Sequence, residues 1–279
     1  MKLFTNTLYI VSTPIGNLKD ITLRAIEVLK NSDIILCEDT RHSIKLFNHY
    51  SIKKKLVPYH KFNEKKQINN IIEHINQGKI LSMVSDAGTP ILSDPGNLLL
   101  NECIRNKIKI CPIPGVSSIT TAMSVSGFGD KFLFYGFLPK TENQVDKVLN
   151  SLSEFKFPII FFIQPLKINF YIEKFKKYFT DRKITICKEM TKLHEDFSRD
   201  NIKDYQLFRN QVKGEITAVI SEKKIIDTKS NKKKIINMAK KFLKKYSVKD
   251  TVDLIMQTEN EKKKIIYNIC LNLKNDKKN

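Results

Sequence analysis

The chain has 279 residues, of which 41% are hydrophobic and 28% are charged, a balance typical of a folded globular protein and not of a disordered one. This length predicts about two domains. The 49 Lys and Arg residues outnumber the 29 Asp and Glu residues, and the net charge of +20 would attract a polyanion such as nucleic acid. A genomic bias toward Lys, Asn and Ile codons would produce the same excess, so charge alone leaves both explanations open.

The sequence shows no signal for a membrane span, a secretory leader, a metal site or a disulfide framework. The longest apolar runs, such as residues 158–163, are far shorter than the roughly 20 residues of a membrane helix. The N-terminal segment leads from an apolar run straight into a turn, as a first strand does, so we expect a cytoplasmic protein with no membrane partner. The cysteines are odd in number and lack CxxC spacing, which predicts neither zinc binding nor disulfides: Cys37, Cys103, Cys111, Cys187 and Cys270.

Short apolar runs alternate with segments of helical periodicity up to about residue 115. In residues 65–79, for example, Ile68, Ile71, Ile72 and Ile75 form one stripe and Gly78 ends the segment. Such alternation is typical of a parallel sheet covered on both faces by helices. The predicted strands are residues 8–12, 33–37, 56–59, 80–85 and 108–111, and the predicted helices are residues 22–31, 44–50, 65–79 and 97–106.

A second series of the same kind follows a break rich in Pro and Gly, and we place a domain boundary near residues 114–118. The fold class is therefore α/β with two domains, residues 1–115 and residues 116–224. The second series has strand-like runs at residues 132–137, 158–163, 183–190 and 215–221, with segments 143–152, 167–179 and 200–212 between them.

Residues 225–279 differ in composition and form a basic helical tail without a strand-like run. Ser247, three residues before Asp250, is a weak capping signal for one of its helices. The tail is either a set of amphipathic helices docked on the body with a solvated basic face, or an appendage that contacts RNA. Its apolar residues recur at helical spacing with Lys on the opposite faces: Ile235, Ala239, Phe242, Ile265, Ile269 and Leu273.

Four loops follow predicted strands and are rich in Gly and Pro: residues 12–20, 37–43, 85–96 and 112–122. Ligands of an open parallel sheet bind at the carboxyl ends of its strands, where helix N-termini offer unpaired N–H groups. Glycine allows close backbone approach and proline stiffens the bends, so the loops together predict a preorganised ligand site.

None of these loops is a phosphate-binding loop, because GxxxxGK[ST] and a GxGxxG after the first strand are both absent, as are GxSxG and HExxH. Asp39, Asp86 and Asp94 could hold a ribose or an amino group, or could cap helices. The loops predict a nucleotide-like ligand without a triphosphate.

Six segments resemble, in this order, the bacterial ribosomal RNA small-subunit methyltransferase I family, a branch of the tetrapyrrole methylase superfamily. They are LYIVSTPIGNLKDITLRAIEVL, CEDTRHS, SDAGTPILSDPG, PIPGVSSITTA, YGFLPK and KEMTK. The resemblance covers Leu8 to about Ser221, and VKDTVDLI with KKKIIYNI fits the family's C-terminal helical segment.

This resemblance implies two α/β domains that bind S-adenosylmethionine in the cleft between them. It also implies a homodimer that methylates the ribose 2′-oxygen of a decoding-region cytidine in small-subunit ribosomal RNA, within an assembled small subunit. The residues it places at the methyl donor are Pro14, Gly16, Asn17, Asp86, Ala87, Gly88, Thr89, Pro90, Ser117 and Ser118, together with the backbone of Phe162 and Ile163.

The chain departs from the family pattern in its second domain. The family usually has Tyr-Glu-Ser followed by His-Arg, whereas this chain reads FFIQPLKI, with Ile163, Gln164, Leu166 and Lys167. Contacts of those Glu, His and Arg side chains therefore do not transfer to this chain.

Methyl transfer to a ribose hydroxyl needs alignment of donor and oxygen and a group that takes the proton. As base, or as the group that positions the hydroxyl, we predict Asp39, Asp86, Glu189 and Lys192. Arg41 and His42 could hold an RNA phosphate. The structural alternatives are a surface ion pair between Glu189 and Lys192 and a loop-stabilising pair between Asp39 and Arg41.

Two other functions remain possible on the sequence. The first is a small-molecule methyltransferase acting on a tetrapyrrole, against which the net charge of +20 and the basic tail argue. The second is a non-catalytic RNA-binding or ribosome-assembly factor that has kept the cleft.

Overall fold

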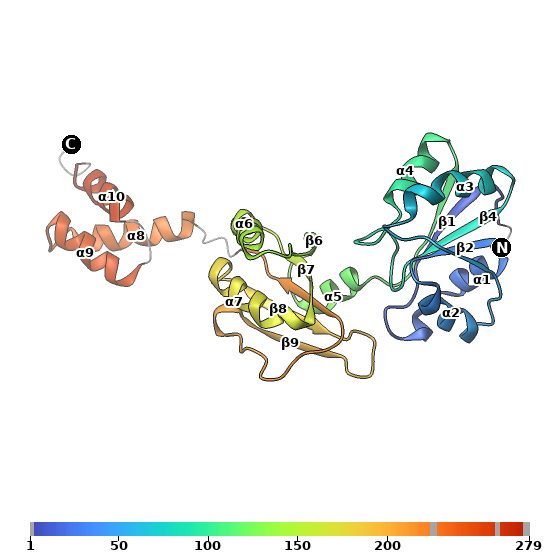
Figure 1. Cartoon of the computed structure of the whole chain (residues 1–279). Coiled ribbons are helices and arrows are strands. Elements are labelled where there is room, and N and C mark those ends of the chain that lie inside the picture. The colour runs from blue at the N-terminus through green and yellow to red at the C-terminus, as the bar shows by residue number, and fades with distance from the viewer. Residues whose placement is uncertain (1–2, 224–227, 260–262, 276–279) are drawn as a thin grey trace. The chain divides into compact units, whose positions relative to one another are not determined.

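The computed structural model describes residues 3–223, 228–259 and 263–275 of the chain (Figure 1). Contacts divide the chain into two compact units, Met1–Lys223 and Lys224–Asn279. The first unit contains two sheets, and we call the part around each sheet a lobe. The predicted α/β class with two sheets and C-terminal helices is confirmed. The predicted domain boundaries at residues 115 and 224 stay predictions.

The first lobe holds a parallel sheet of five strands in the order β3-β2-β4-β1-β5. Tyr9 and Val11 point to one face of the sheet, and Leu8 and Leu81 point to the other, as the alternation of side chains along a strand requires. The strands are β1 (Thr7–Val11), β2 (Ile34–Cys37), β3 (Lys55–Pro58), β4 (Ile80–Val84) and β5 (Lys109–Ile113).

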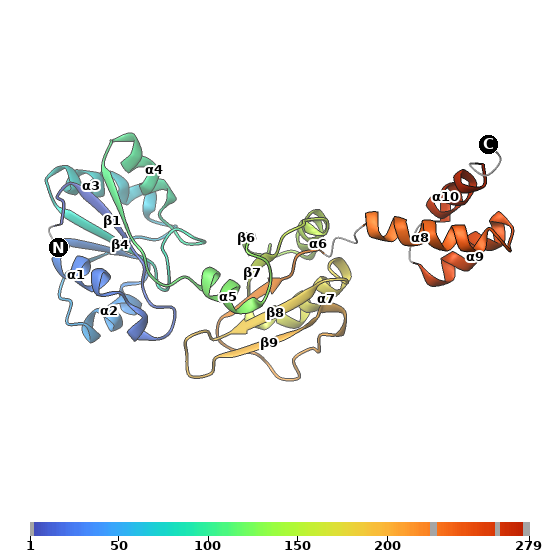
Figure 2. The same cartoon turned by 180° about the vertical axis from the view of Figure 1, so that it is seen from behind.

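Helices cover both faces of this sheet. Helices α1 and α2 pack on the face of Tyr9, and α3 and α4 pack on the face of Leu8, as Figures 1 and 2 show from opposite sides. They are α1 (Leu23–Asn31), α2 (Thr40–His49), α3 (Glu64–Asn76) and α4 (Asn97–Arg105).

The strand order places a topological switch point between the neighbours β1 and β4. The chain leaves β1 toward β2 on one side and leaves β4 toward β5 on the other side. The helices that follow β1 and β4, α1 and α4, therefore lie on opposite faces of the sheet. Open α/β sheets bind ligands at the carboxyl edge beside such a switch point.

The second lobe has a mixed sheet in the order β6-β7-β10-β8-β9, in which β6 and β7 are parallel and β10 is antiparallel to both β7 and β8. The start of β10 therefore lies beside the carboxyl ends of β7 and β8: Ile216 pairs with Ile163 and Lys188. The strands are β6 (Leu133–Phe137), β7 (Ile159–Ile163), β8 (Lys183–Lys188), β9 (Asp196–Asn201) and β10 (Ile216–Ile220).

The alternation predicted for the second lobe is wrong at one place. Residues 200–212 lie between two strands but contain no α-helix; they contain the end of β9 and a short 3-10 turn, Ile202–Asp204. Strand β9 pairs antiparallel with β8 at the edge of the sheet. Its sequence, DFSRDN, is polar because an edge strand faces solvent, so it lacks the apolar signal of a buried strand.

Helices α6 (Glu142–Leu152) and α7 (Ile168–Tyr178) cover one face of the second sheet, and α5 (Ser118–Ser126) covers the other. The cluster under α5 also contains Ile15 and Ala87 from the loops of the first lobe. The two lobes therefore share one apolar cluster next to the switch point.

The second unit is built from α8 (Thr228–Phe242), α9 (Val248–Thr258) and α10 (Lys263–Asn275) around its own apolar core. Ser247 caps α9 as predicted, since its hydroxyl accepts a hydrogen bond from the Asp250 N–H at 3.2 Å. The prediction for Ile265 is wrong: Ile265 is 41% exposed and its neighbour Ile266 is buried.

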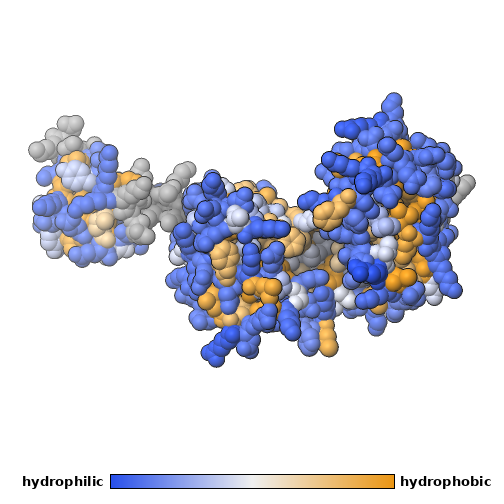
Figure 3. All heavy atoms as spheres, viewed as in Figure 1, coloured by the Kyte–Doolittle hydropathy of each residue, from blue (hydrophilic) through white to orange (hydrophobic). Residues whose placement is uncertain are grey.

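Hydrophilic residues surround apolar ones on the visible face of the second unit (Figure 3). Several lysines of this unit are exposed, which agrees with the basic outer faces expected from the sequence: Lys233, Lys234, Lys240, Lys241, Lys244, Lys245 and Lys249. Across the described parts of both units, no helix has the length and apolar character needed to cross a membrane.

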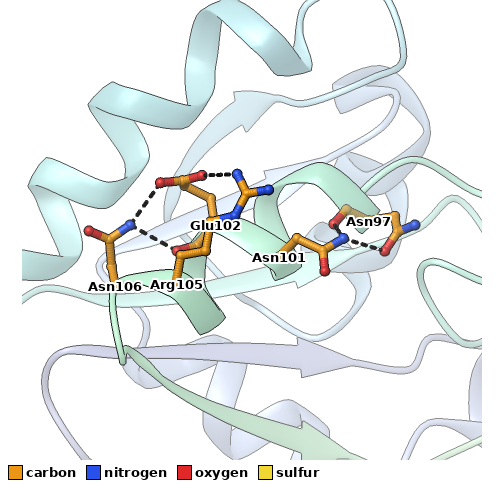
Figure 4. Close-up of polar contacts among 5 residues, drawn as sticks. All are labelled: Asn97, Asn101, Glu102, Arg105 and Asn106. Atoms are coloured by element: carbon orange, nitrogen blue, oxygen red, sulfur yellow. Dashed lines mark hydrogen bonds and ion pairs between the residues drawn. The ribbon is translucent and has the colours of Figure 1, made fainter.

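The far end of α4 carries a polar network on its surface (Figure 4). Glu102 accepts hydrogen bonds from Arg105 at 3.1 Å and from Asn106 at 2.9 Å. The Asn106 side chain also donates to the Glu102 carbonyl at 2.8 Å, which accepts the Asn106 backbone N–H at 3.0 Å as well. Because a helix of this length spans about 13 Å, this network lies well away from the loop that precedes α4.

Candidate functional site

The loops after β1 and β4 are bound to each other at the switch point. Thr13 N–H donates to the Gly88 carbonyl at 2.9 Å, and Gly88 N–H donates to the Thr13 carbonyl at 3.0 Å. The hydroxyls of Ser12 and Thr89 lie 3.1 Å apart, and Thr89 donates to the Val116 carbonyl in the loop after β5. These three loops are therefore connected by hydrogen bonds, and the fourth loop predicted as a site joins them because the Asp39 N–H donates to Asp86 Oδ1 at 3.1 Å.

The loop after β4 adopts left-handed backbone conformations at several residues. Gly88 has φ +76°, and Ile91 and Ser93 have φ 77° and 72°. A β-branched residue such as Ile91 rarely adopts this conformation, which costs on the order of 1–3 kcal/mol. Strain of this kind concentrates at ligand sites, because the surrounding structure must fix the loop in one shape.

A cavity of about 310 Å³, called cavity A here, opens at these loops. It is lined by the three connected loops of the first lobe and by β7, the turn after β7 and the start of β10 from the second lobe. It brings together seven of the residues predicted to bind the methyl donor: Ala87, Gly88, Thr89, Ser117, Ser118, Phe162 and Ile163.

Cavity A suits a cationic ligand that carries no phosphate. Among the described residues that line it, the charged ones are Asp94 and Glu215, and there is no Lys, Arg or His. The pKa of Asp94 is raised to about 6, chiefly by burial and also by the nearby Asp86 carboxylate, although a hydrogen bond from Ser85 opposes the shift. The rings of Phe137 and Phe162, 5.3 Å apart between centroids, add an aromatic wall.

A second cavity of about 370 Å³, called cavity B, lies on the other side of the same loops. It shares Ile15, Ala87 and Glu215 with cavity A, so the two cavities adjoin. Its lining contains His42, Lys45 and Lys192 as well as carboxylates, unlike that of cavity A. The predicted site residues that line it are Pro14, Gly16, His42, Asp86, Ala87 and Lys192.

Lys192 lies in cavity B between two carboxylates. Its Nζ is 2.9 Å from Glu189 Oε1 and 3.3 Å from Glu215 Oε2. Burial lowers the pKa of Lys192, but the two carboxylates raise it by more, so the side chain is held as an ammonium. A Cβ on Gly16 would lie 2.4 Å from Lys192 Cγ, so only glycine at position 16 leaves room for this lysine.

Glu189 supports this arrangement from the end of β8. It has φ 51°, its N–H donates to the Glu215 carbonyl at 2.9 Å, and its carboxylate accepts from the Glu215 N–H at 2.7 Å. Burial raises the pKa of Glu189, but the Glu215 N–H and Lys192 lower it by more. The ion pair considered as a structural alternative for Glu189 and Lys192 is present, and it faces a cavity.

Asp39 is held by its own helix and lines neither cavity. It caps α2, accepts from the Arg41 N–H at 2.9 Å and pairs with the Arg41 guanidinium at 2.8 Å. Hydrogen bonds from Arg41 lower the pKa of Asp39 to about 2. The structure thus shows the loop-stabilising pair, and residues 40–43, expected in a loop, form the first turn of α2 because Asp39 caps them.

The remaining predicted residues lie around these cavities. Asn17 and Pro90 line neither cavity; Asn17 N–H donates to Thr191 Oγ1 at 3.1 Å and so joins the first lobe to the segment of Lys192. Arg41 is 89% exposed at its side chain. The segment of Ser117 and Ser118 was expected as a loop, but α5 begins at Ser118.

Sequence reasoning missed Glu215, which lines both cavities. It searched the carboxyl ends of strands, whereas Glu215 precedes β10, whose antiparallel direction brings its start to the site. Asp94 had a signal, since it was noted as able to hold an amino group, and it lines cavity A. Phe137 and Met190 also line cavity A, at the ends of β6 and β8.

The chain was compared with known proteins. A family model described as Tetrapyrrole (Corrin/Porphyrin) Methylases matches residues 7–206. A protein of Thermotoga maritima named Ribosomal RNA small subunit methyltransferase I is 43% identical over 219 residues, which cover 77% of this chain and 98% of the relative. The protein of that name from Buchnera aphidicola is 38% identical over 273 residues, covering 95% of this chain and 96% of the relative.

Solved structures share the fold at low identity. Diphthine synthase superposes with a TM-score of 0.61 at 15% identity, covering 77% of this chain and 90% of that chain. Uroporphyrin-III C-methyl transferase from Thermus thermophilus, complexed with S-adenyl homocysteine, superposes with a TM-score of 0.55 at 13% identity. The match covers 77% of this chain and 97% of that chain.

The chain belongs to the tetrapyrrole methylase family and, within it, to the ribosomal RNA small subunit methyltransferase I branch. The resemblance drawn from the six sequence segments is thereby confirmed, and the general activity is methyl transfer.

Proposed function

We propose that the protein transfers a methyl group from S-adenosylmethionine to the ribose 2′-hydroxyl of a cytidine in the decoding region of small-subunit ribosomal RNA. The observation that carries this proposal is the pair of adjoining cavities of different character: among their described lining residues, one has carboxylates without a cation, and the other has lysines as well as carboxylates. The names of relatives at 43% and 38% identity support the same substrate class.

The residues of cavity A fit S-adenosylmethionine, whose sulfonium supplies an electrophilic methyl group when it is bound. Asp94 would attract the positive charge of the sulfonium and the ammonium, and the face of Phe162 would pack on the adenine. Gly88 lets the two bridged loops pack closely beside the cavity, because a Cβ there would be 3.2 Å from Ile15 Cγ2. A phosphate-bearing ligand would meet the carboxylates without a compensating cation.

Cavity B would hold the acceptor ribose beside the donor. Asp86 lines cavity B, where its carboxylate can accept a hydrogen bond from a ribose hydroxyl and orient it. Lys192, as an ammonium, can donate to the acceptor oxygen but cannot take its proton. His42 in cavity B and the exposed Arg41 can contact RNA phosphates.

The proposal extends to the setting in which the protein acts. We infer a cytoplasmic homodimer that modifies an assembled small subunit, since the sequence resemblance implies these partners. The basic excess of +20 would steer the protein to ribosomal RNA.

A labelling experiment tests this function. The protein is incubated with tritiated S-adenosylmethionine and one of three acceptors: small subunits from a strain that lacks the modification, protein-free ribosomal RNA, or precorrin. Label in the RNA of the subunits, mapped to a 2′-O-methylcytidine, is the expected result. Label in precorrin alone would indicate the tetrapyrrole activity, and donor binding without transfer to any acceptor would indicate a non-catalytic assembly factor.

A further inference from the structure

The reacting atoms must meet where cavity A adjoins cavity B. If the donor occupies one cavity and the acceptor the other, the methyl group crosses the wall that they share. Attack requires the acceptor oxygen about 3–3.5 Å from the methyl carbon, in line with the bond that breaks. The shared wall consists of Ile15, Ala87 and Glu215 among the described residues.

A group that takes the hydroxyl proton must lie within hydrogen-bond reach of the acceptor oxygen at this wall. Ile15 and Ala87 have side chains that cannot accept a proton. Glu215 has a carboxylate, and it is the titratable residue among the described ones that line both cavities.

The backbone of Glu215 is fixed while its carboxylate is accessible. Two hydrogen bonds with Glu189 extend the pairing of β10 and β8 by one residue: Glu189 N–H to the Glu215 carbonyl at 2.9 Å, and Glu215 N–H to Glu189 Oε1 at 2.7 Å. The Glu215 side chain is 70% exposed, and its Oε2 is 3.3 Å from Lys192 Nζ. Its Oε1 has no hydrogen-bond partner among the described residues, so one oxygen can face the acceptor.

The other titratable residues are placed less well for this task. Asp86 lines cavity B alone, and its Oδ1 already accepts the Asp39 N–H at 3.1 Å. Asp94 lines cavity A alone. Lys192 is held as an ammonium by its two carboxylates.

We propose that Glu215 is the general base of the methyl transfer, an assignment that rests on the proposed function. Glu215 takes the proton of the 2′-hydroxyl as the bond from oxygen to the methyl carbon forms. The bond from sulfur to the methyl carbon breaks, and its electron pair stays on sulfur as a neutral thioether. Lys192 orients the Glu215 carboxylate and Glu189 holds Lys192, so these two are positioning residues for the base.

Strand β10 offers a matched pair of glutamates for the test. Glu215 precedes the strand at the site, and the exposed Glu222 follows it at the opposite end, where it lines neither cavity. Single-turnover methylation of small subunits is measured from pH 4 to 9 for the wild type and the variants Glu215→Gln, Glu215→Asp, Asp86→Asn and Glu222→Gln. Donor binding is measured by calorimetry for each variant.

We expect Glu215→Gln to lower the methylation rate by about 10²–10⁴-fold, the usual contribution of general base catalysis, with the donor Kd changed less than about threefold. The fall of the wild-type rate at acid pH should disappear in Glu215→Gln and persist in Asp86→Asn and Glu222→Gln. Glu215→Asp keeps a carboxylate, so its methylation rate should be lower than that of the wild type but should still fall at acid pH.

A Glu215→Gln rate within about threefold of the wild type would overturn the assignment. The assignment would also be overturned if the methylation rate of Glu215→Gln still fell at acid pH while that of Asp86→Asn did not. That result would place the base at Asp86. If Glu215→Gln does not fold, the proposal is tested by Glu215→Asp. A Glu215→Asp methylation rate that does not fall at acid pH contradicts the proposal. Absence of transfer by the wild type overturns the proposed function itself, and this assignment with it.

Discussion

Two lysines of the second lobe each lie between two carboxylates, but Lys192 lines cavity B whereas Lys174 lines neither cavity. Lys174 on α7 contacts Glu142 at 2.5 Å and Asp146 at 2.9 Å, both on α6. Hydrogen bonds with Asp146 and Glu142 raise the pKa of Lys174. The triplet joins two regular helices on the surface of the lobe and lines neither cavity A nor cavity B.

Lys192 also has two carboxylate partners, but they lie on irregular segments of backbone and not on helices. Its carboxylate partners come from the segment after β8 and from the start of β10, and Glu189 and Thr191 have positive φ angles of 51° and 68°. The segment points the ammonium into cavity B instead of along a helix surface. The charges of the two triplets are alike, so the role of each is decided by the backbone that carries it and by the cavity that it faces.

The comparison predicts its largest effect for the two lysines themselves. Lys192→Met should lower kcat/KM for methylation by about 100-fold, because it removes a charge-assisted hydrogen bond that orients the base and the acceptor. Lys174→Met should leave kcat/KM within about twofold while it reduces stability slightly. Steady-state kinetics and thermal unfolding of both variants measure this, and equal losses of activity would break the comparison.

A smaller effect is expected at the carboxylate of cavity B. Asp86→Asn keeps the shape of the side chain but removes its charge, and should lower turnover by about 30-fold with an unchanged fold. Methylation kinetics and the circular dichroism spectrum check this. Near-normal methylation by this variant would remove Asp86 from the site.

Asp94 should show a trade between stability and donor binding. Its pKa of about 6 in the folded protein exceeds the ordinary value of 3.8, so the folded state favours the protonated form. Stability therefore rises as the pH falls from about 6 toward 4, and ionised Asp94 is unfavourable above pH 6.

Asp94→Asn should thus stabilise the protein at pH 8 by about 1 kcal/mol, a figure reduced for partial solvent exposure, and weaken donor binding there by about tenfold. Wild-type donor affinity should fall as the pH drops below 6, while the variant should show a flat profile. Calorimetry at pH 5 and 8 measures both effects, and a variant that binds the donor as the wild type does would place the donor's cation elsewhere.

The smallest effect is expected at the far end of α4. Glu102→Gln removes the exposed ion pair with Arg105, at 3.1 Å, and keeps a side chain that can still bond to Asn106 (Figure 4). Stability should change by less than about 0.5 kcal/mol and methylation should not change. A clear loss of activity in this variant would show that removing a charge far from cavities A and B is enough to disturb the site.

Most of the first lobe could be predicted from the sequence because its central strands β1, β2 and β4 are buried and its helices have one apolar stripe. The end of β9 and the start of β10 could not, because β9 is a polar edge strand and the direction of β10 leaves no local pattern. Glu215 was missed for this reason. The capped turn at Asp39 was missed because EDTRH reads equally well as a loop.

The strained loop after β4 was predicted as a site from its Gly and Pro, but its conformation was not. Nothing about Ile91 favours a φ of 77°, since a β-branched residue argues against it. The loop is joined to the loop after β1 by the bridge between Thr13 and Gly88, a contact between residues distant in the sequence that no local pattern reveals.

The close approach of Gly16 to Lys192 restricts how this site can evolve. Any side chain at position 16 would collide with the middle of the lysine, at Cγ, and also with Thr191 Oγ1 at 2.8 Å. A shorter residue at position 192 would relieve the collision with Lys192 but remove the ammonium, and the collision with Thr191 would remain. Neither position can change first without loss of function, so a saturation library at position 16 selected for methylation should return glycine, and the pair should be inherited as one unit.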